Sequence, residues 1–382
     1  MGENLKSLVG VYYGLVAELN GKVALLHQRK LLEHDFGPGH PFRRERFLLY
    51  FNLLEEMGIL DLPWVSVIDP QFKATEEDIL AVHDRSLLEL IRALSEKGGR
   101  LDADTPVPPG TFERALIQAG GIIYAGRKVM LGEFARAIQC VAFGGHHATR
   151  AHYGFSFGFC YFNDDSIVIR HLQRHGYVKR AFILDCDGHH GNGIQEIFYE
   201  DPSVLYMSLH QDPLTLYPGT GRITEVGAGE GEGYTVNVPL PPGVGNQSYL
   251  RALKEIFPPL MREFKPDLLL FIVGADNYFA DPLTRYGLTM EVYPELTRTV
   301  LDCASEVCAG KALIRLGGGY HVKAAVHAFY LVTACAVGVE NLEIKDMAPP
   351  PTKSEEPYVT RQVDQTLKEL KRILSKYWRC FR

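Results

Sequence analysis

Histidines, aspartates and one tyrosine of this chain come directly after short apolar runs. They are His146, His147, Asp185, Asp187, His189, His190, Asp276 and Tyr320. Asp187 and His189 are two residues apart in a glycine-rich segment, so their side chains can point the same way, and Asp276 follows a different run. Two carboxylates and one imidazole leave a coordination position of a metal ion open, as in a catalytic rather than a structural site. We therefore expect a hydrolytic metal centre, whose oxygen and nitrogen ligands suit zinc or ferrous iron.

The adjacent histidines and the tyrosine could transfer protons and bind an oxyanion. His146 and His147 can both face a cleft if their segment is a loop, and histidine titrates near neutral pH. Tyr320 follows three glycines, where the backbone can bend sharply, and its hydroxyl could donate a hydrogen bond to a developing oxyanion. Any one of these residues alone could be a helix cap or a hydrogen-bonded core residue. Their common position after apolar runs favours a shared site.

The elements that must position these residues are alternating strands and helices. We predict buried strands at Cys140–Phe143, Ala181–Leu184, Val204–Leu209, Leu268–Val273 and Ala312–Leu316. We predict helices at Phe112–Leu131, Gln247–Phe264, Glu291–Cys308 and Ala324–Val337. This alternation is typical of an α/β fold whose parallel sheet is covered on both faces. Ligands bind beyond the carboxyl ends of such strands, so the polar clusters should meet in one crevice.

Composition argues against several classes of protein. The chain has 382 residues, of which 46% are hydrophobic, and α/β enzymes of this length often form a single domain. A net charge of −6 without a basic stretch argues against a nucleic-acid partner. No apolar run approaches the roughly 20 residues that span a bilayer, and the N-terminus lacks signal-peptide features. Seven cysteines without a CxxC pair suggest free thiols, so we expect a cytoplasmic protein that binds no membrane.

The C-terminal region forms a separate feature of the sequence. We predict a catalytic domain over residues 1–347, then a proline-rich connection and an amphipathic helix over residues 348–382. The apolar residues of this helix follow a 4-3-4-3 spacing; they are Val363, Leu367, Leu370, Leu374 and Tyr377. Such a helix packs on the body of the chain or, in the alternative, joins two subunits of an oligomer.

An ordered set of short motifs resembles the histone deacetylase family, in particular its bacterial branch of acetoin-utilisation proteins. The resemblance covers roughly residues 30–340. The motifs are His40-Pro41-Phe42-Arg43-Arg44-Glu45-Arg46, Asp104-Thr105-Pro106, Gly145-His146-His147-Ala148, Gly158-Phe159-Cys160-Tyr161-Phe162-Asn163-Asp164, Asp185-Cys186-Asp187-Gly188-His189-His190-Gly191-Asn192-Gly193, Ser208-Leu209-His210, Tyr217-Pro218-Gly219-Thr220-Gly221, Gly274-Ala275-Asp276 and Gly317-Gly318-Gly319-Tyr320. Each motif is moderately specific, whereas the ordered set is very specific.

The resemblance implies an arginase/deacetylase fold, a single α/β domain with a parallel sheet of about eight strands. It assigns the metal ion to Asp187, His189 and Asp276. It makes His147 the general base, His146 its electrostatic partner oriented by Asp185, and Tyr320 the group that polarises the acyl carbonyl. The residues that it assigns to the substrate tunnel and its rim are Asp104, Gly158, Phe159, Tyr217 and Leu283. Arg46 matches an arginine near an inner product channel.

The resemblance also implies two potassium sites. The residues of the first site are Asp185, Asp187, His189, Ser208 and Leu209. The residues of the second site are Phe198, Asp201, Val204 and Tyr234. Backbone oxygens would supply most of the ligands.

The implied reaction is metal-dependent removal of the acetyl group from lysine side chains of a protein or peptide, by analogy a metabolic enzyme such as acetyl-CoA synthetase. One alternative is an acetylpolyamine or other small-molecule amidohydrolase. A binuclear, arginase-type hydrolase would need a second carboxylate where Tyr278 stands, and a non-catalytic reader of acyl-lysine would not need the complete set of catalytic residues. The chain departs from many members at Asn192, where an aspartate is common, so we expect a changed pKa for His147.

Overall fold

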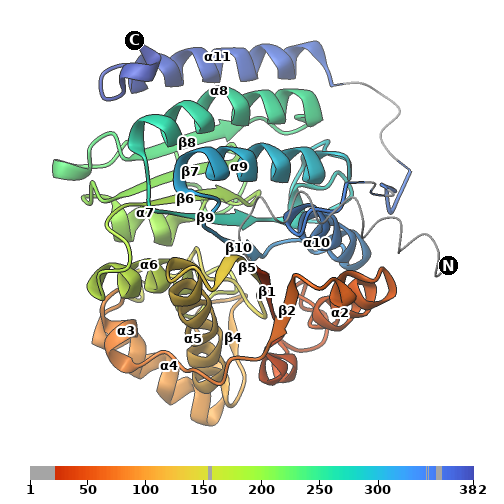
Figure 1. The fold of residues 1–382 in the computed structure, drawn as a ribbon. Coiled ribbons are helices and arrows are strands. Elements are labelled where there is room, and N and C mark those ends of the chain that lie inside the picture. Colours follow the sequence, from red (N-terminus) through yellow and green to blue (C-terminus); the bar gives the residue numbers. More distant parts are fainter. Residues whose placement is uncertain (1–21, 154–156, 341, 343, 350–354) are drawn as a thin grey trace.

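Eight parallel strands form the central sheet of the computed structural model, which describes residues 22–153, 157–340, 342, 344–349 and 355–382 (Figure 1). Their order across the sheet is β2-β1-β5-β10-β9-β6-β7-β8. Their bounds are Lys22–Leu26 (β1), Val65–Ile68 (β2), Phe134–Cys140 (β5), Ala181–Cys186 (β6), Val204–Gln211 (β7), Thr235–Leu240 (β8), Leu268–Val273 (β9) and Ala312–Leu316 (β10). Strands β6, β7, β9 and β10 are buried along their whole length, as in a sheet covered on both faces. The α/β class and the parallel sheet agree with the prediction from the sequence.

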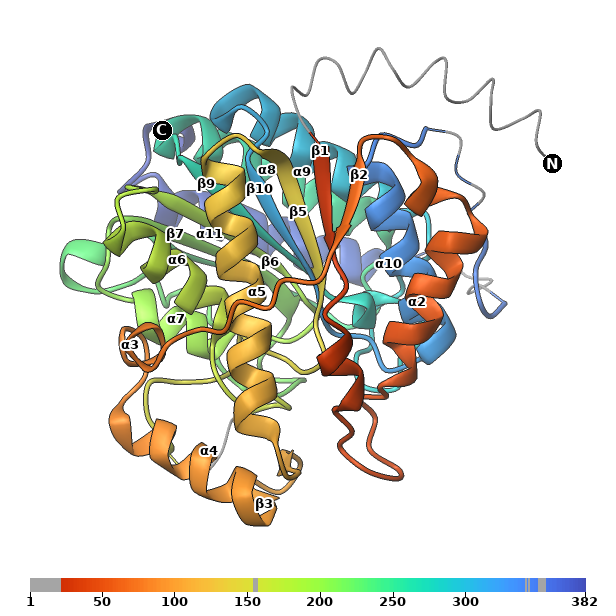
Figure 2. The ribbon, with the colours of Figure 1, turned by 60° about the horizontal axis from the view of Figure 1, so that its bottom comes forward.

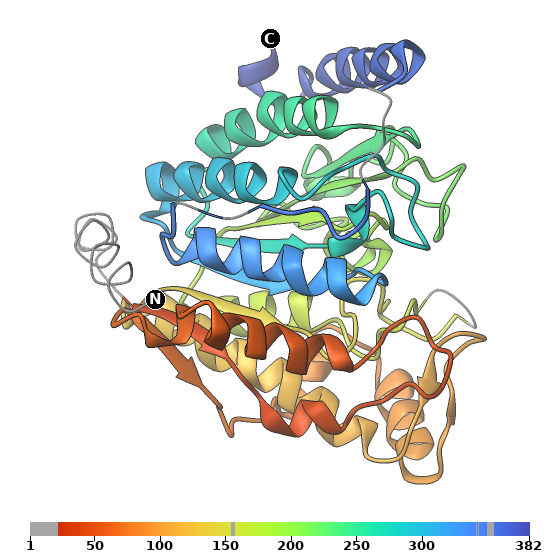
Figure 3. The ribbon, with the colours of Figure 1, turned by 90° about the vertical axis from the view of Figure 1, so that its right-hand side faces the viewer.

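Helices cover both faces of this sheet. On one face lie α2 (Glu45–Glu56), α10 (Val322–Ala336), α9 (Val292–Cys308) and α8 (Asn246–Phe264), side by side in Figure 3. The other face carries α5 (Thr111–Met130) and α6 (Asp164–Arg174), with α7 (Asn192–Phe198) beside them (Figure 2). Two further helices, α3 (Glu76–Leu80) and α4 (Arg85–Lys97), pack beyond α5 and α6, together with the strand pair β3 (Gly99–Arg100) and β4 (Pro106–Val107). Within the described ranges, no helix is both long and apolar enough to cross a membrane.

Most of the predicted elements are present. Four of the five predicted strands lie within β6, β7, β9 and β10. The four predicted helices correspond to α5, α8, α9 and α10, with ends shifted by one or two residues.

The prediction of the strand before the catalytic histidines was wrong in its position. We predicted Cys140–Phe143, whereas β5 runs over Phe134–Cys140. This strand contains the buried polar residues Arg136 and Gln139, each of which donates a hydrogen bond to a carbonyl of a neighbouring helix. Gln139 Nε2, for example, donates to the carbonyl of Gln118 at 3.0 Å. The prediction relied on apolar runs, so it placed the start of this strand too late in the sequence.

The C-terminal helix α11 (Pro357–Leu374) lies against α8 and β8. Its stripe residues Val363, Leu367, Leu370 and Leu374 are buried there. Packing on the same chain thus accounts for the apolar stripe, and contact with a second subunit through this helix stays a prediction. The domain boundary at residue 347 also stays a prediction, and residues 350–354 of the proline-rich connection lie outside the described residues.

The packing of α11 predicts a clear cost for removing one of its buried side chains. Leu370 is 1% exposed, so Leu370→Ala should lower the free energy of unfolding by about 2–5 kcal/mol. Equilibrium unfolding in urea, followed by circular dichroism, measures this value. Lys368→Ala on the exposed face of the same helix is the matched control and should change it by less than about 0.5 kcal/mol. Equal effects of the two substitutions would contradict this account of α11.

Candidate active site

The three predicted metal ligands come together at the carboxyl ends of β6 and β9. One ligand atom from each of Asp187, His189 and Asp276 lies within 4.8 Å of the other two, and all three residues are buried. Among the described residues this is the one group of three or more histidine, cysteine or acidic side chains that could hold a metal ion. His189 Nδ1 lies 2.7 Å from Asp276 Oδ2 and 3.2 Å from Asp187 Oδ1.

The space and charge at this cluster fit a divalent cation. Gly318 lies so close that a Cβ there would approach carboxylate oxygens of both Asp187 and Asp276 within 3.0 Å, so glycine keeps the site open. Burial, and then the charge of Asp187, raise the pKa of Asp276 to about 7. Burial alone would lower the pKa of His189, but hydrogen bonds to Asp187 and Asp276 raise it to about 10. The buried carboxylates of Asp187 and Asp276 repel each other. A metal cation that replaced the proton of the His189 imidazole would offset this repulsion.

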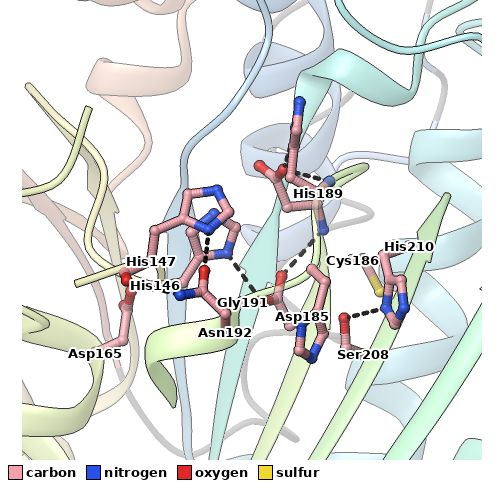
Figure 4. A network of polar contacts seen from close by, with 12 residues as sticks. His146, His147, Asp165, Asp185, Cys186, His189, Gly191, Asn192, Ser208 and His210 are labelled. Atoms are coloured by element: carbon pink, nitrogen blue, oxygen red, sulfur yellow. Dashed lines mark hydrogen bonds and ion pairs between the residues drawn. The ribbon is translucent and has the colours of Figure 1, made fainter. Parts of the chain in front are cut away.

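The two adjacent histidines lie in the loop after β5 and have different partners (Figure 4). His146 Nδ1 lies 3.0 Å from Asp185 Oδ2, and His147 Nδ1 lies 2.7 Å from Asn192 Oδ1. Because the Asn192 amide oxygen can only accept, His147 Nδ1 donates and its Nε2 is left with a lone pair.

Charges around these histidines push their pKa values apart. Burial alone would lower the pKa of His146, but the charge and hydrogen bond of Asp185 raise it to about 9. Burial lowers the pKa of His147 well below its usual value, and the neighbouring cations His146 and His189 lower it further. Near neutral pH, His146 is therefore a cation and His147 a neutral base.

A pocket of about 310 Å³ leads to the metal ligands. Every residue that the sequence assigned to the substrate lines it, and the lining residues are Pro41, Asp104, His147, Gly158, Phe159, His189, Leu216, Tyr217, Leu283 and Tyr320. The walls are aromatic: the ring centroid of Phe159 is 5.8 Å from that of Tyr320, and that of Tyr217 is 5.2 Å from that of His147. Gly158 has φ +49°, and a Cβ there would collide with the His147 ring. Pro41 and Leu216 are lining residues that sequence reasoning did not assign, although both stand next to assigned positions or inside quoted motifs.

Tyr320 ends the tunnel beside the metal ligands. Burial, and then the charges of Asp187 and Asp276, raise its pKa well above the usual value, so its hydroxyl stays a donor at neutral pH. Its backbone N–H donates to Asp281 Oδ2 at 2.7 Å, and the Leu283 N–H donates to Asp281 Oδ1 at 2.9 Å. Asp281 therefore holds both the loop that carries Tyr320 and the tunnel wall at Leu283. Sequence reasoning missed this role because a lone aspartate in a loop belongs to no specific pattern.

Arg46 supports the glycine run before Tyr320 from the inner side. Its fully buried guanidinium donates from Nη1 to the carbonyls of Gly318 at 3.0 Å and Gly319 at 2.6 Å. Gly317 and Gly318 also line a small inner cavity of about 30 Å³ behind the metal ligands. Arg46 thus reaches the predicted inner channel through the backbone carbonyls.

The residues of the predicted potassium sites lie on or next to β6, α7, β7 and β8. Asp185 of β6 is the register partner of Ser208 on β7, and Leu209 follows Ser208 directly. At the second site, Asp201 N–H donates to the carbonyl of Phe198, and Val204 N–H donates to that of Asp201. Tyr234 accepts from the Tyr206 N–H through its carbonyl. Potassium binding at both positions stays a prediction.

The rim of the tunnel carries two acidic residues. The Asp104 backbone N–H donates to Asp102 Oδ1 at 3.3 Å, and the Asp104 carbonyl accepts from His40 Nε2 at 2.9 Å. Half-burial, and then the hydrogen bond and charge of Asp102, raise the pKa of Asp104 to about 6. Above this pH Asp104 presents a carboxylate to whatever occupies the tunnel mouth.

Comparison with known proteins agrees with this geometry. A model of the histone deacetylase domain matches residues 40–336. A probable deacetylase of Archaeoglobus fulgidus is 39% identical over 366 residues, which cover 94% of this chain and 99% of that protein. The acetoin utilization protein AcuC of Bacillus subtilis is 34% identical over 75% of this chain and 74% of its own length. The solved structure of the HDA15 HD domain superposes with a TM-score of 0.81 and 27% identity, covering 94% of this chain and 97% of that one. The domain match and these relatives show that the chain belongs to the histone deacetylase family, in the branch similar to the AcuC proteins.

Proposed function

We propose that this chain is a metal-dependent deacetylase that hydrolyses the side-chain amide of acetyl-lysine in proteins. The observation that carries the proposal is a tunnel, walled by Phe159 and Tyr217, that ends at the Asp187–His189–Asp276 cluster. A neutral, aliphatic acyl-lysine arm tolerates such aromatic walls, and its carbonyl would meet polar groups only at the end.

Asp187, His189 and Asp276 would hold the metal ion, for which we propose zinc or ferrous iron. Such an ion polarises a carbonyl and lowers the pKa of a water molecule bound to it. His147 would take a proton from the attacking water at Nε2 and later deliver it to the amine nitrogen. The Tyr320 hydroxyl would donate to the carbonyl oxygen as negative charge develops there. His146, held by Asp185, keeps a positive charge next to His147.

A second candidate substrate is an acetylated polyamine. The Asp104 carboxylate at the rim would attract its cationic amines. The match to the histone deacetylase domain favours a protein substrate, and we keep an acetylated metabolic enzyme such as acetyl-CoA synthetase as its expected class. All seven cysteines are unpaired, which supports our proposal of a reducing, cytoplasmic location.

Turnover with defined substrates tests the proposal. The full chain, stripped of metal and then reloaded separately with zinc and ferrous iron, should release acetate from an acetyl-lysine peptide only when metal is supplied. Acetate release from acetylspermidine should be at least about tenfold slower in kcat/KM. Preference for acetylspermidine would move the chain to the small-molecule class, and activity without metal would reject the mechanism.

Two variants separate metal binding from polarisation of the carbonyl. Asp276→Ala removes a ligand, so metal content and turnover should be lost together. Tyr320→Phe removes only the hydroxyl, so metal content should persist while kcat falls by about 10²–10³. Metal analysis and steady-state kinetics measure both effects, with Tyr124→Phe on α5 as a control that should behave like the wild type. Full activity of Tyr320→Phe would rule out the role given to its hydroxyl.

The rim carboxylate predicts a pH-dependent KM. Because the pKa of Asp104 is raised to about 6, its negative charge is present above that pH and lost as the pH falls through it. We expect the KM for an acetyl-lysine peptide to rise by about tenfold between pH 7.5 and pH 5, since a protonated carboxyl accepts hydrogen bonds from substrate amides less strongly. Asp104→Ala should have a high KM at both pH values, whereas Asp61→Asn on the distant 3-10 helix Ile59–Asp61 should keep the wild-type profile. If the KM of Asp104→Ala rose between pH 7.5 and pH 5 as much as that of the wild type, this role of Asp104 would be contradicted.

A further inference from the structure

A second cavity lies between the C-terminal halves of α9 and α10 and the first half of β5. Its volume is about 390 Å³, and Arg136 forms part of its wall. Arg136 is the third residue of β5, whereas the catalytic histidines follow the other end of that strand. The cavity and the tunnel therefore open toward opposite ends of the sheet.

Arg136 is buried with most of its hydrogen-bonding capacity unused. The residue is 3% exposed, and a guanidinium has five N–H donors. Within the described part of the chain, Arg136 makes one hydrogen bond, from Nη1 to the carbonyl of Ala336 at 3.3 Å, and its buried Nε has no partner. Burial lowers the pKa of Arg136 to about 10, so the side chain is still a cation at neutral pH.

Two features offset part of this charge, but only one of them accepts a hydrogen bond from Arg136. The carboxylate of Asp302 acts on Arg136 through space, but no described carboxylate forms an ion pair with it within 4.0 Å. Ala336 is the last residue of α10, whose C-terminal carbonyls carry partial negative charge. A buried cation is strongly destabilising unless its donors are satisfied. Since Arg136 also lines the cavity, its guanidinium is available to an anionic ligand bound there.

We propose that this cavity binds a small carboxylate that carries one negative charge and a short apolar body. The carboxylate would accept hydrogen bonds from Arg136, and Arg298 on α9 supplies a second cation in the cavity wall. Leu301 and Val339 provide apolar surface for the rest of the ligand.

The charges in the wall select for a single negative charge on the ligand. Asp302 and Glu340 also line the cavity and equal the two arginines in formal charge. A ligand with several negative charges would be repelled by both carboxylates, whereas a single carboxylate gains its pairing with Arg136 against less repulsion. The site is independent of the metal centre and goes beyond the proposed deacetylase reaction.

Ligand-observed ¹⁹F NMR with 4,4,4-trifluorobutyrate tests the proposal on the full chain. Metal-free protein excludes carboxylate binding to an active-site metal, so binding should persist with the same affinity after the metal is removed. The neutral analogue 4,4,4-trifluorobutanol should bind at least about tenfold more weakly, because it lacks the carboxylate that Arg136 recognises. Loss of binding on metal removal, or equal binding of the alcohol, would overturn the proposal.

Three substitutions locate the bound carboxylate. Arg136→Met keeps the length of the side chain and should weaken binding by about tenfold or more, and Arg298→Gln should weaken it by about threefold. Asp302→Asn removes the competing carboxylate and should strengthen binding by about threefold, an effect that loss of structure would not produce. If Arg136→Met fails to fold in a thermal melt, Asp302→Asn decides the question. Unchanged or weaker binding in Asp302→Asn would overturn the proposal.

Discussion

The burial of two carboxylates against one imidazole is the constraint on which the rest of the site depends. Asp187, His189 and Asp276 lie so close together that the two carboxylates repel each other unless a cation lies between them. Their backbones are held in place by β6 and β9, which are adjacent and buried in the parallel sheet. The sheet is thus the rigid support that keeps an electrostatically unfavourable cluster assembled and ready for a divalent ion.

The second consequence of this cluster is the difference between the two neighbouring histidines. His146 faces the carboxylate of Asp185, whereas His147 faces the neutral amide of Asn192 and lies near the cationic side chains. One histidine is therefore stabilised as a cation and the other as a neutral base, although they are adjacent in the sequence. Asn192 fixes which nitrogen of His147 carries the proton, as an aspartate would, but it does not raise the pKa of that histidine through a charge.

The shape of the tunnel depends on two glycines, at which the backbone lies close to side chains of the site. Gly158 brings the Phe159 wall against the His147 ring, and Gly318 brings the Tyr320 loop against the carboxylates. The Arg46 guanidinium on α2 donates hydrogen bonds to the carbonyls of that loop. It thereby holds a segment more than 270 residues away along the chain. Asp281 holds the same loop from the other side.

The sequence by itself determined the α/β class, the parallel sheet and the candidate metal ligands. These features were readable because apolar strands leave continuous runs, and because the polar residues stand directly after those runs at the carboxyl ends of the strands. The same criterion misplaced β5, since Arg136 and Gln139 are buried through polar contacts with elements distant in the sequence. Only the tertiary structure decided the lining of the tunnel by Pro41 and Leu216 and the support from Asp281, whereas the family resemblance had already placed Asp185 beside His146. Those contacts join separate loops, and distances between loops are set by packing of the whole sheet rather than by spacing along the chain.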